Sequence, residues 1–310
     1  MRPIRDSLLL LSRSGAAQRL VSTLPLSAGV VRSYVPGETV SDALAAAQAF
    51  AAEGIDVTID HLGEETLDEV QATAAVQAYR VLLDRISDAR LGRRAEVSVK
   101  LTALGLRLDG GERIALENAR RICRAAASAG TTVTIDMEDH TTTDATLRVV
   151  RALREEFPGT GAVLQAYLHR TEADCRELAH AGSRVRLCKG AYDEPAAVAF
   201  TEPGDVDRSY VRCLKVLLAG DGYPMIATHD PRLVEIAEAL ASRYGRAQGS
   251  YEFQMLHGVR PAEQRRLAAS GERVRVYLPY GEQWYGYLMR RLAERPQNLS
   301  LFLTSLISKK

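Results

Sequence analysis

A group of charged and aromatic side chains near the C-terminus has the residue types and spacing to bind an amino acid. The spacing i, i+3, i+4 and i+7 places four of them on one face of a helix: Tyr287, Arg290, Arg291 and Glu294. Because a guanidinium offers a planar fork of donors that fits a carboxylate, adjacent arginines beside an acid could seat a zwitterion. A solvated, salt-bridged helix face is the alternative.

Lysine usage gives a second indication of chemistry. The chain has few lysines, and those away from the C-terminus are Lys100, Lys189 and Lys215. Lys100 and Lys189 stand at the ends of strand-like runs, where an ammonium could bind an anion or act as a Schiff-base amine. An ordinary ion pair at a strand end is the alternative, and for Lys189 the two interpretations carry equal weight.

The elements that must position these side chains alternate regularly from residue 55 onward. Eight runs have strand character: 55–60, 97–101, 133–137, 162–168, 185–190, 224–228, 250–254 and 274–278. Helical segments separate them: 65–90, 111–129, 144–156, 171–181, 207–219, 231–244 and 261–269. This alternation predicts a closed parallel (β/α)8 barrel of the TIM type over residues 51–310, preceded by an N-terminal helical segment, residues 1–50. The alanine-rich residues 41–52 are expected to form a helix outside the barrel.

A doubly wound open sheet is the competing α/β architecture. Its dinucleotide fingerprint, a GxGxxG turn after an early strand, is absent from the sequence, and so is the Walker GxxxxGK[ST] motif. The sequence therefore favours the barrel.

The two faces of the predicted strands differ in polarity. Alternate residues point to opposite sides of a strand, and here one set is apolar. The other set includes Asp56, Asp60, Ser98, Lys100, Thr134, Asp136, Arg186, Cys188, Glu252, Gln254, Arg275 and Tyr277. In a parallel barrel the apolar set must meet the helices, so the polar set points inward. An antiparallel sheet with one solvated face would alternate in the same way, but the long helical connections argue against it.

Barrel enzymes carry their chemistry at the carboxyl ends of the strands. We therefore expect the inward residues near those ends to converge with the Tyr287 helix: Lys100, Asp136, Arg186 and Tyr277.

Composition excludes several functional classes. The net charge of +1, from 40 basic and 39 acidic residues, gives no electrostatic footprint for nucleic acid. The four cysteines lie far apart without a CxxC pair, as is typical of reduced thiols in a cytosol. The six histidines form no HExxH motif or histidine-cysteine cluster, so no metal is indicated.

The N-terminal region bears on localisation. Its first 37 residues contain a single acid, Asp6, among arginines and serines, which fits a transit peptide or a bacterial N-terminal helix. The apolar run 8–11 is too short for a membrane span, which needs about 20 residues. Leucines beside Arg2, Arg5 and Arg13 would make a basic amphipathic helix. We expect a cytoplasmic protein and leave open a peripheral contact at the inner face of the membrane.

Seven short motifs occur in order along the barrel region: SVKLT at 98–102, TIDME at 134–138, LQAY at 164–167, VRLCKGAY at 185–192, ATHD at 227–230, YEFQMLHG at 251–258 and YGYLMRRLAE at 285–294. Together they resemble the proline dehydrogenase family of FAD-dependent barrel enzymes, over residues 55–294. The resemblance implies that L-proline binds over FAD, with its carboxylate paired by Arg290, Arg291 and Lys100. Glu294 would support this cationic cluster.

The resemblance also assigns roles around the flavin. Arg186 would lie against the isoalloxazine near N5, and Gln165 would hydrogen-bond the ring. Other residues would line FAD: Met137, Lys189, Gly190, Ala191, Thr228 and His229. Residues packed around the substrate ring would be Leu256, Tyr277 and Tyr287, with Tyr192 closing the site beneath them. Asp136 matches the active-site aspartate of the family and would orient Lys100 or Arg186 or organise the flavin site, with a structural ion pair as the alternative.

The implied reaction is oxidation of L-proline to Δ1-pyrroline-5-carboxylate by hydride transfer to flavin N5, the first step of proline catabolism to glutamate. Electrons would pass to a membrane quinone. Because the chain ends soon after the Tyr287 helix, the product would go to a separate pyrroline-5-carboxylate (glutamate semialdehyde) dehydrogenase. Two other functions stay open: a Schiff-base aldolase or lyase using Lys100 or Lys189, and a noncatalytic amino-acid-binding protein.

Overall fold

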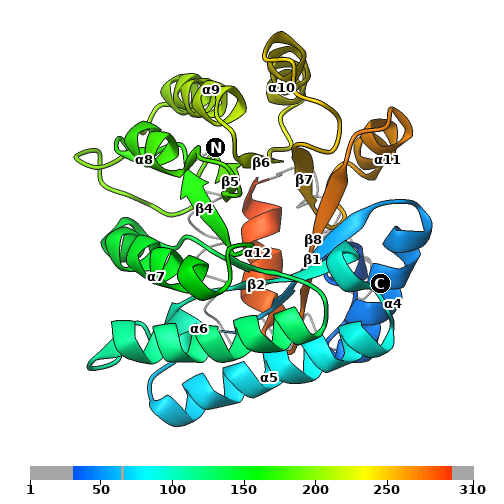
Figure 1. Cartoon of the computed structure of the whole chain (residues 1–310), viewed down its shortest axis with the longest axis vertical. Coiled ribbons are helices and arrows are strands. Elements are labelled where there is room, and N and C mark those ends of the chain that lie inside the picture. Colours follow the sequence, from blue (N-terminus) through cyan, green and yellow to red (C-terminus); the bar gives the residue numbers. More distant parts are fainter. Residues whose placement is uncertain (1–30, 64–65, 295–310) are drawn as a thin grey trace, which may run out of the picture.

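The eight apolar runs form eight parallel strands, each paired with the next, and β8 closes onto β1 (Figure 1). This computed structural model describes residues 31–63 and 66–294, without the side chains of residues 290 and 292–294. The strands are β1 (Asp56–His61), β2 (Ala95–Val99), β3 (Val133–Ile135), β4 (Gly161–Gln165), β5 (Arg184–Cys188), β6 (Tyr223–Ala227), β7 (Glu252–Leu256) and β8 (Val274–Tyr280). The predicted (β/α)8 barrel is thereby confirmed.

Strand ends differ from the prediction by a few residues, most clearly at β4. The predicted run continued to residue 168, but β4 ends at Gln165. Beyond it the chain turns, because the Leu168 amide donates to the Gln165 carbonyl. A local turn therefore ends the strand although the sequence stays apolar.

Seven helices connect the strands and surround the barrel: α5 (Glu69–Asp88), α6 (Gly111–Ser128), α7 (Thr143–Glu156), α8 (Thr171–Leu178), α9 (Pro203–Ala219), α10 (Pro231–Arg243) and α11 (Pro261–Ala269). Three short 3-10 turns lie next to strands of the described chain. The turn η1 (Gly92–Arg94) precedes β2, η2 (Thr102–Leu104) follows β2, and η3 (His140–Thr142) follows β3. Several helices begin at side-chain caps, as where Asp68 accepts from the Gln71 amide and Asp230 from the Arg232 amide.

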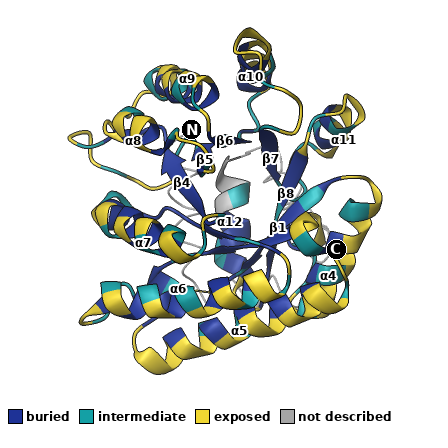
Figure 2. Cartoon of the chain, viewed as in Figure 1, coloured by how far each residue is buried: buried dark blue, intermediate teal, exposed yellow. Residues whose placement is uncertain are grey.

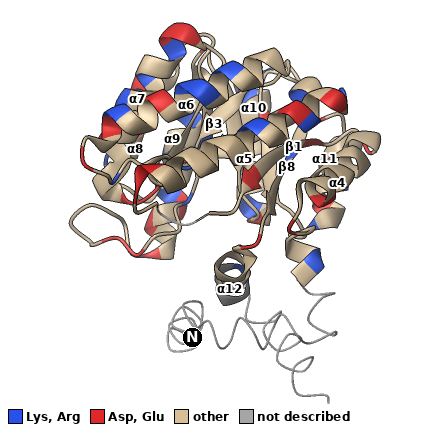
Figure 3. Ribbon diagram, turned by 90° about the horizontal axis from the view of Figure 1, so that it is seen from below, with Lys and Arg blue, Asp and Glu red and all other residues tan. Residues whose placement is uncertain are grey.

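The helix before β1 occupies the place in the ring that the helix after β8 would otherwise take. It is α4 (Val40–Ala52), which packs against β1 and β8 through the fully buried Ala43 and Ala47. The helix after β8, α12 (Trp284–Glu294), instead lies on the barrel axis, in the centre of Figure 1 and beyond the end of the barrel in Figure 3. The predicted domain boundary at residue 50 falls inside α4 and stays a prediction.

The apolar core lies between the strands and the helices. Outward residues such as Ile59, Val97 and Ile135 are fully buried, whereas the outer faces of the helices are exposed (Figure 2). Each such side chain contributes about 1.5–3 kcal/mol when it leaves water. As predicted, the apolar face of the strands meets the helices and the polar face points into the barrel. No helix in the described part of the chain is both long and apolar enough to span a membrane.

The amino ends of the strands fill the bottom of the barrel with charges, which we call the lower network: Asp56, Glu96, Arg184, Glu252 and Arg275. Arg184 Nη2 lies 2.6 Å from Glu96 Oε2, and Arg275 Nε lies 2.8 Å from Glu252 Oε1. Burial alone would raise the pKa of Glu96, but its arginine neighbours hold that pKa well below the ordinary value. Glu96 is therefore ionised, and each carboxylate of the lower network lies beside an arginine.

Candidate active site

The carboxyl ends of the strands bring a second charged group together, which we call the upper cluster: Asp60, Lys100, Asp136, Arg186 and Tyr277. Asp60 comes from β1, Arg186 from β5 and Tyr277 from β8, while Lys100 and Asp136 directly follow β2 and β3. The predicted convergence of the inward residues at this end is therefore observed.

Asp136 binds three donors within the upper cluster. Its Oδ1 accepts from Arg186 Nη1 and from Ser98 Oγ, both at 2.7 Å, and its Oδ2 accepts from the Tyr277 hydroxyl at 2.8 Å. Burial, and then the charge of Asp136, raises the pKa of Tyr277 well above its ordinary value, so the phenol keeps the proton that it donates. Of the two partners considered for Asp136, Arg186 is the one in direct contact, since Lys100 Nζ is 4.0 Å away.

Lys100 is held by a different carboxylate. Its Nζ lies 2.7 Å from Asp60 Oδ2, and its side chain is 27% exposed whereas that of Asp60 is 2% exposed. Burial favours the neutral amine, but Asp60 and Asp136 outweigh it and raise the pKa of Lys100 above its ordinary value. The lysine is therefore an ammonium with one side open.

Arg186 connects the upper cluster to the lower network. Its Nε donates to Gln254 Oε1 at 2.6 Å, and Gln254 Nε2 donates to Glu252 Oε1 at 2.6 Å. The guanidinium carbon also lies 5.3 Å from the centroid of the Tyr277 ring, within cation–π range. Its Nη2 is buried without a hydrogen-bond partner among the described residues and lies 3.8 Å from Glu96 Oε1.

Three contacts at this site were not assigned to it from the sequence: Asp60, Ser98 and Gln254. All three belong to the inward polar set, so the strand alternation carried the signal. The alternation does not predict which residue each of them contacts, because the partners are distant in sequence: Arg186 and Gln254 are 68 positions apart.

The Tyr287 helix, α12, contributes an aromatic side chain and an arginine. Tyr287 is 6% exposed and packs in one apolar cluster with Tyr34, Leu62 and the partly buried Leu256. The Arg291 guanidinium carbon lies 5.2 Å from the Tyr287 ring centroid, so the predicted i, i+4 neighbours do meet. A fully solvated face would not bury Tyr287. The side chains of Arg290 and Glu294 lie outside the described residues.

The predicted flavin-lining residues follow the carboxyl ends of four consecutive strands, β3 to β6. Met137 is buried after β3, and Gln165 ends β4 with its Nε2 donating to the Glu138 carbonyl at 2.7 Å. Lys189 Nζ lies 2.6 Å from Asp207 Oδ1 and 3.2 Å from Asp230 Oδ2.

Two further pairs of predicted flavin-lining residues follow β5 and β6, and we call the whole row of these residues the arc. Gly190 has φ of +112°, and a Cβ there would lie 2.3 Å from ring atoms of Tyr167, so only glycine fits beside the exposed Ala191. Thr228 is buried after β6, and the next residue, His229, accepts from the Leu256 amide through Nε2 at 2.8 Å.

These residues fit a dinucleotide cofactor. The arc offers the cationic donors Arg186 and Lys189, and at Gly190 a backbone without a side chain. The chemistry of this donor set therefore suits an anionic, ring-bearing group such as FAD.

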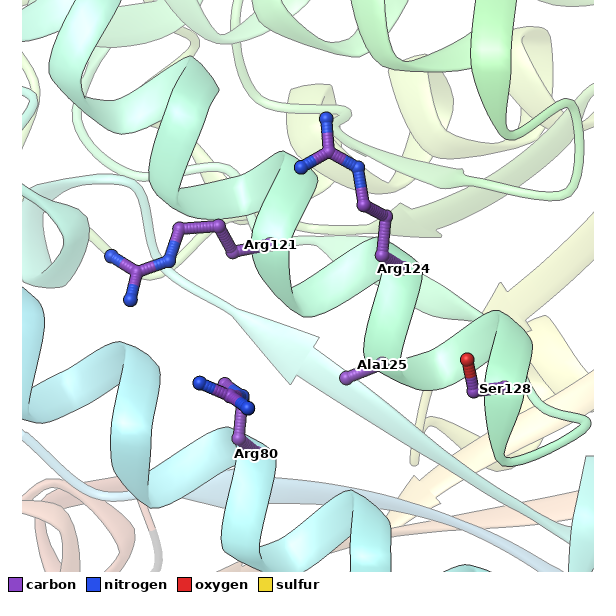
Figure 4. A pocket seen from close by; sticks show the side chains of 5 residues that line it. All are labelled: Arg80, Arg121, Arg124, Ala125 and Ser128. Carbon is purple, nitrogen blue, oxygen red and sulfur yellow. The ribbon is translucent and has the colours of Figure 1, made fainter.

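Other hollows of the described surface are less suitable. One, with an empty volume of about 500 Å³, lies between α5 and α6 and is lined by Arg80, Arg121, Arg124, Ala125 and Ser128 (Figure 4). It has no aromatic wall for a flavin, and it lies outside the barrel. Within the described residues, no three His, Cys, Asp or Glu side chains gather in a way that could hold a metal ion.

Comparisons with known proteins identify the family of this chain. The family model described as "Proline dehydrogenase" matches residues 43–302. Proline dehydrogenase 1 of Bacillus subtilis (strain 168) is 35% identical over 306 residues, covering 99% of this chain and 100% of that protein. Proline dehydrogenase of Deinococcus radiodurans is 39% identical over 277 residues, covering 88% of this chain and 89% of that protein.

A solved structure has the same fold. It is proline utilization A (PutA) from Bdellovibrio bacteriovorus inactivated by N-propargylglycine, with a TM-score of 0.81 and 26% identity. The similarity covers 92% of this chain but 34% of that one, so the chain spans about a third of that PutA. With the family model and the curated relatives matching along nearly its whole length, the chain belongs to the proline dehydrogenase family of oxidoreductases.

Proposed function

We propose that this protein oxidises L-proline to Δ1-pyrroline-5-carboxylate, with hydride transfer to N5 of FAD, as the first step of proline catabolism to glutamate. The observation that carries the proposal is the arrangement at the barrel mouth. A half-open ammonium, Lys100, lies at the carboxyl ends of the strands, and α12 brings Arg291 and Tyr287 to the same end. Together they offer cations to a carboxylate and an aromatic face to a ring.

The substrate carboxylate is paired by Lys100, Arg290 and Arg291, with Glu294 supporting the arginines. The ring packs among Tyr277, Tyr287 and Leu256, with Tyr192 beneath. Holding the carboxylate by several cations fixes the orientation of the ring and so the direction in which its C–H bond points. Orientation of this kind, rather than covalent attack, is what the residues of this site supply.

FAD is held by Arg186, Gln165, Met137, Lys189, Gly190, Ala191, Thr228 and His229. When bound, FAD accepts the hydride at N5. Arg186 places a permanent positive charge beside the flavin, which favours the reduced, anionic form. Asp136 and Tyr277 keep Arg186 in place through the hydrogen bonds described above.

The Schiff-base alternative is disfavoured by the state of the two lysines. A nucleophilic amine must be neutral, but Asp60 and Asp136 raise the pKa of Lys100 and keep it charged. Lys189 is salt-bridged to Asp207 and Asp230. Both side chains thus serve as cationic donors.

Electrons pass from the flavin to a membrane quinone. Because that acceptor resides in the bilayer, the protein works in the cytoplasm with peripheral contact at the inner face of the membrane. The product is taken up by a separate pyrroline-5-carboxylate (glutamate semialdehyde) dehydrogenase. Similarity to proteins named "Bifunctional protein PutA" supports this coupling of two activities, since the Escherichia coli protein is 30% identical over 308 residues that make up 23% of its length.

An anaerobic titration of the purified protein with L-proline tests the reaction. We expect a yellow protein whose flavin absorbance is bleached by proline and restored by a quinone analogue. A colourless protein that borohydride traps covalently with a keto substrate would support the aldolase or lyase instead. A protein that binds proline without reducing flavin would support the noncatalytic binding function.

Replacing Arg291 by Met tests the carboxylate assignment. Loss of a charged hydrogen-bonding partner costs about 2–5 kcal/mol, so KM for proline should rise by at least about tenfold. Arg85→Met on the exposed face of α5 is the matched control, since Arg85 is 63% exposed and far from the mouth, and its KM should stay near the wild-type value. An unchanged KM in both Arg290→Met and Arg291→Met would refute the assignment.

A further inference from the structure

Asp60 is a buried carboxylate whose only role so far is to keep Lys100 charged. It lies near the end of β1, and its side chain is 2% exposed. Its Oδ2 accepts from Lys100 Nζ at 2.7 Å, and its Oδ1 lies 3.3 Å from the Tyr79 hydroxyl. A buried charge needs a partner, and here Lys100 is the one with opposite charge.

The contact with Tyr79 is secondary. The Tyr79 hydroxyl has one hydrogen, and its shorter contact, 2.7 Å, is with the Ser98 carbonyl. Burial raises the pKa of Tyr79 well above its ordinary value, so the phenol stays neutral and adds no charge beside Asp60. The ammonium of Lys100 is therefore the main donor to Asp60.

Asp136 cannot take over this role. Its two oxygens already accept from Arg186, Ser98 and Tyr277, and Lys100 is 4.0 Å away. The neighbouring His61 has its pKa lowered by burial and, to a smaller extent, by Lys100, so it is neutral near pH 7 and offers no competing cation. Lys100 thus depends on Asp60 for its placement.

We propose that Asp60 is a positioning residue, which holds the Lys100 ammonium at the barrel mouth so that it meets the anionic end of the substrate. A lysine side chain has four rotatable bonds, and its head group is otherwise free to turn toward water. Fixing it before the substrate arrives removes an ordering cost from binding. This inference rests on the proposed function, in which Lys100 pairs the carboxylate.

A double-mutant cycle tests the coupling. Cyclopentanecarboxylate has the ring and the carboxylate but no amine to oxidise, and its binding to the flavin-loaded protein is measured by calorimetry. We expect Lys100→Met and Asp60→Asn each to weaken binding about tenfold, and the double variant to bind within about twofold of Lys100→Met alone. Additive losses in the double variant would overturn the proposal.

Asp56→Asn is the matched control for the fold. Asp56 starts the same strand and points inward too, but it pairs with Arg275 at the opposite end of the barrel, 3.3 Å away. Its removal should leave binding of the ring carboxylate within about twofold of wild type. A loss as large as that of Asp60→Asn would mean that any inward carboxylate on β1 has this effect, and would refute a specific role.

A second readout needs no substrate and no activity. Reductive methylation modifies only neutral amines, and peptide mass spectrometry reports each lysine separately. In the wild type, Lys100 should react more slowly than the exposed Lys215, and Asp60→Asn should speed its modification while leaving Lys215 unchanged. An unchanged rate at Lys100 would overturn the proposal even if the protein binds no ring carboxylate, an outcome that would by itself refute only the proposed function.

The Asp60→Glu variant provides a second test of the proposal if Asp60→Asn does not fold. This variant keeps the negative charge, so Lys100 should stay as protected from methylation as in the wild type. Rapid methylation in a folded Asp60→Glu protein would show that charge pairing does not hold the ammonium, and the proposal would fail.

Discussion

The two ends of the barrel interior hold similar numbers of buried charges but differ in how completely these charges are used. In the lower network, Glu96 and Glu252 have side chains 1% exposed and Arg275 is 5% exposed, and each carboxylate is paired with an arginine. The most exposed members of the lower network are Asp56 at 17% and Arg184 at 14%, whereas in the upper cluster Lys100 is 27% exposed. The lower network is closed on itself, whereas the upper cluster keeps a cation open at the mouth.

This difference shows that charged residues inside a barrel do not by themselves identify an active site. Both groups arise from the same alternation along the strands, and both contain buried ion pairs. What separates them is the strand end at which they lie, because the carboxyl ends open toward the loops and α12. At the amino ends, the backbone of η1 contacts the lower network through the Arg93 carbonyl, which accepts from Arg275. Arg186 and Gln254 join the two groups through hydrogen bonds, so a substitution in one group can be tested for its effect on the other.

The largest effect is expected from Glu96→Ala in the lower network. Removal of this carboxylate leaves the partly buried Arg184 without its ion-pair partner, while Arg275 keeps Glu252 at 2.8 Å, and it should lower the free energy of unfolding by about 3–5 kcal/mol. Chemical denaturation measures the loss. KM for proline of the folded protein should stay near the wild-type value.

The control is an exposed ion pair of the outer ring. Glu112 Oε2 lies 2.7 Å from Arg148 Nη2 with both side chains exposed, so Glu112→Ala should cost less than about 1 kcal/mol. If Glu96→Ala cost no more than this control, or if it shifted proline binding, the two ends of the barrel would not be separable in the way described here.

An intermediate effect is expected from Tyr277→Phe in the upper cluster. The ring stays, but the hydrogen bond to Asp136 is lost, and a bond to a charged acceptor contributes about 1.5–3 kcal/mol to stability. Unlike Glu96→Ala, this variant should also slow flavin reduction by proline, because Asp136 and Arg186 lose a fixed neighbour. Stopped-flow absorbance measures that rate, and a wild-type rate would place Tyr277 with the structural residues.

The smallest effect is a pH dependence confined to the upper end. Burial lowers the pKa of His61 in the folded protein, so the unfolded chain binds its proton more readily than the folded one. The stability contributed by the neutral imidazole is present above the unfolded pKa of about 6.5 and is lost as the pH falls through the folded value. His61→Gln should therefore lose less stability than the wild type between pH 7 and pH 5.

Equilibrium unfolding at several pH values measures how steeply the free energy of unfolding changes with pH in the wild type and in His61→Gln. Parallel slopes for the wild type and His61→Gln would contradict the prediction. Arginines do not titrate in this pH range, so Arg184 and Arg275 of the lower network do not themselves make the free energy of unfolding depend on pH.

Much of the fold could be predicted from the sequence because its signals are local. Periods of two and of 3.6 residues, with proline and glycine at the ends, located each of the eight strands and the helices between them. The order of the motifs identified the family. At the site, alternation alone indicated that Lys100, Asp136, Arg186 and Tyr277 point inward near the mouth, as the structure has them.

What only the tertiary structure decided is which of these residues meet. Asp136 and Tyr277 are 141 positions apart, and closure of β8 onto β1 brings them to 2.8 Å. The pairing of β1 with β2 brings Lys100 to Asp60 rather than to Asp136. Helix α4 packs on β1 and β8 in the ring, and α12 lies across the mouth. A sequence period fixes the side of a strand on which a residue lies, but the distance between two strands depends on register and barrel closure, which involve the whole chain.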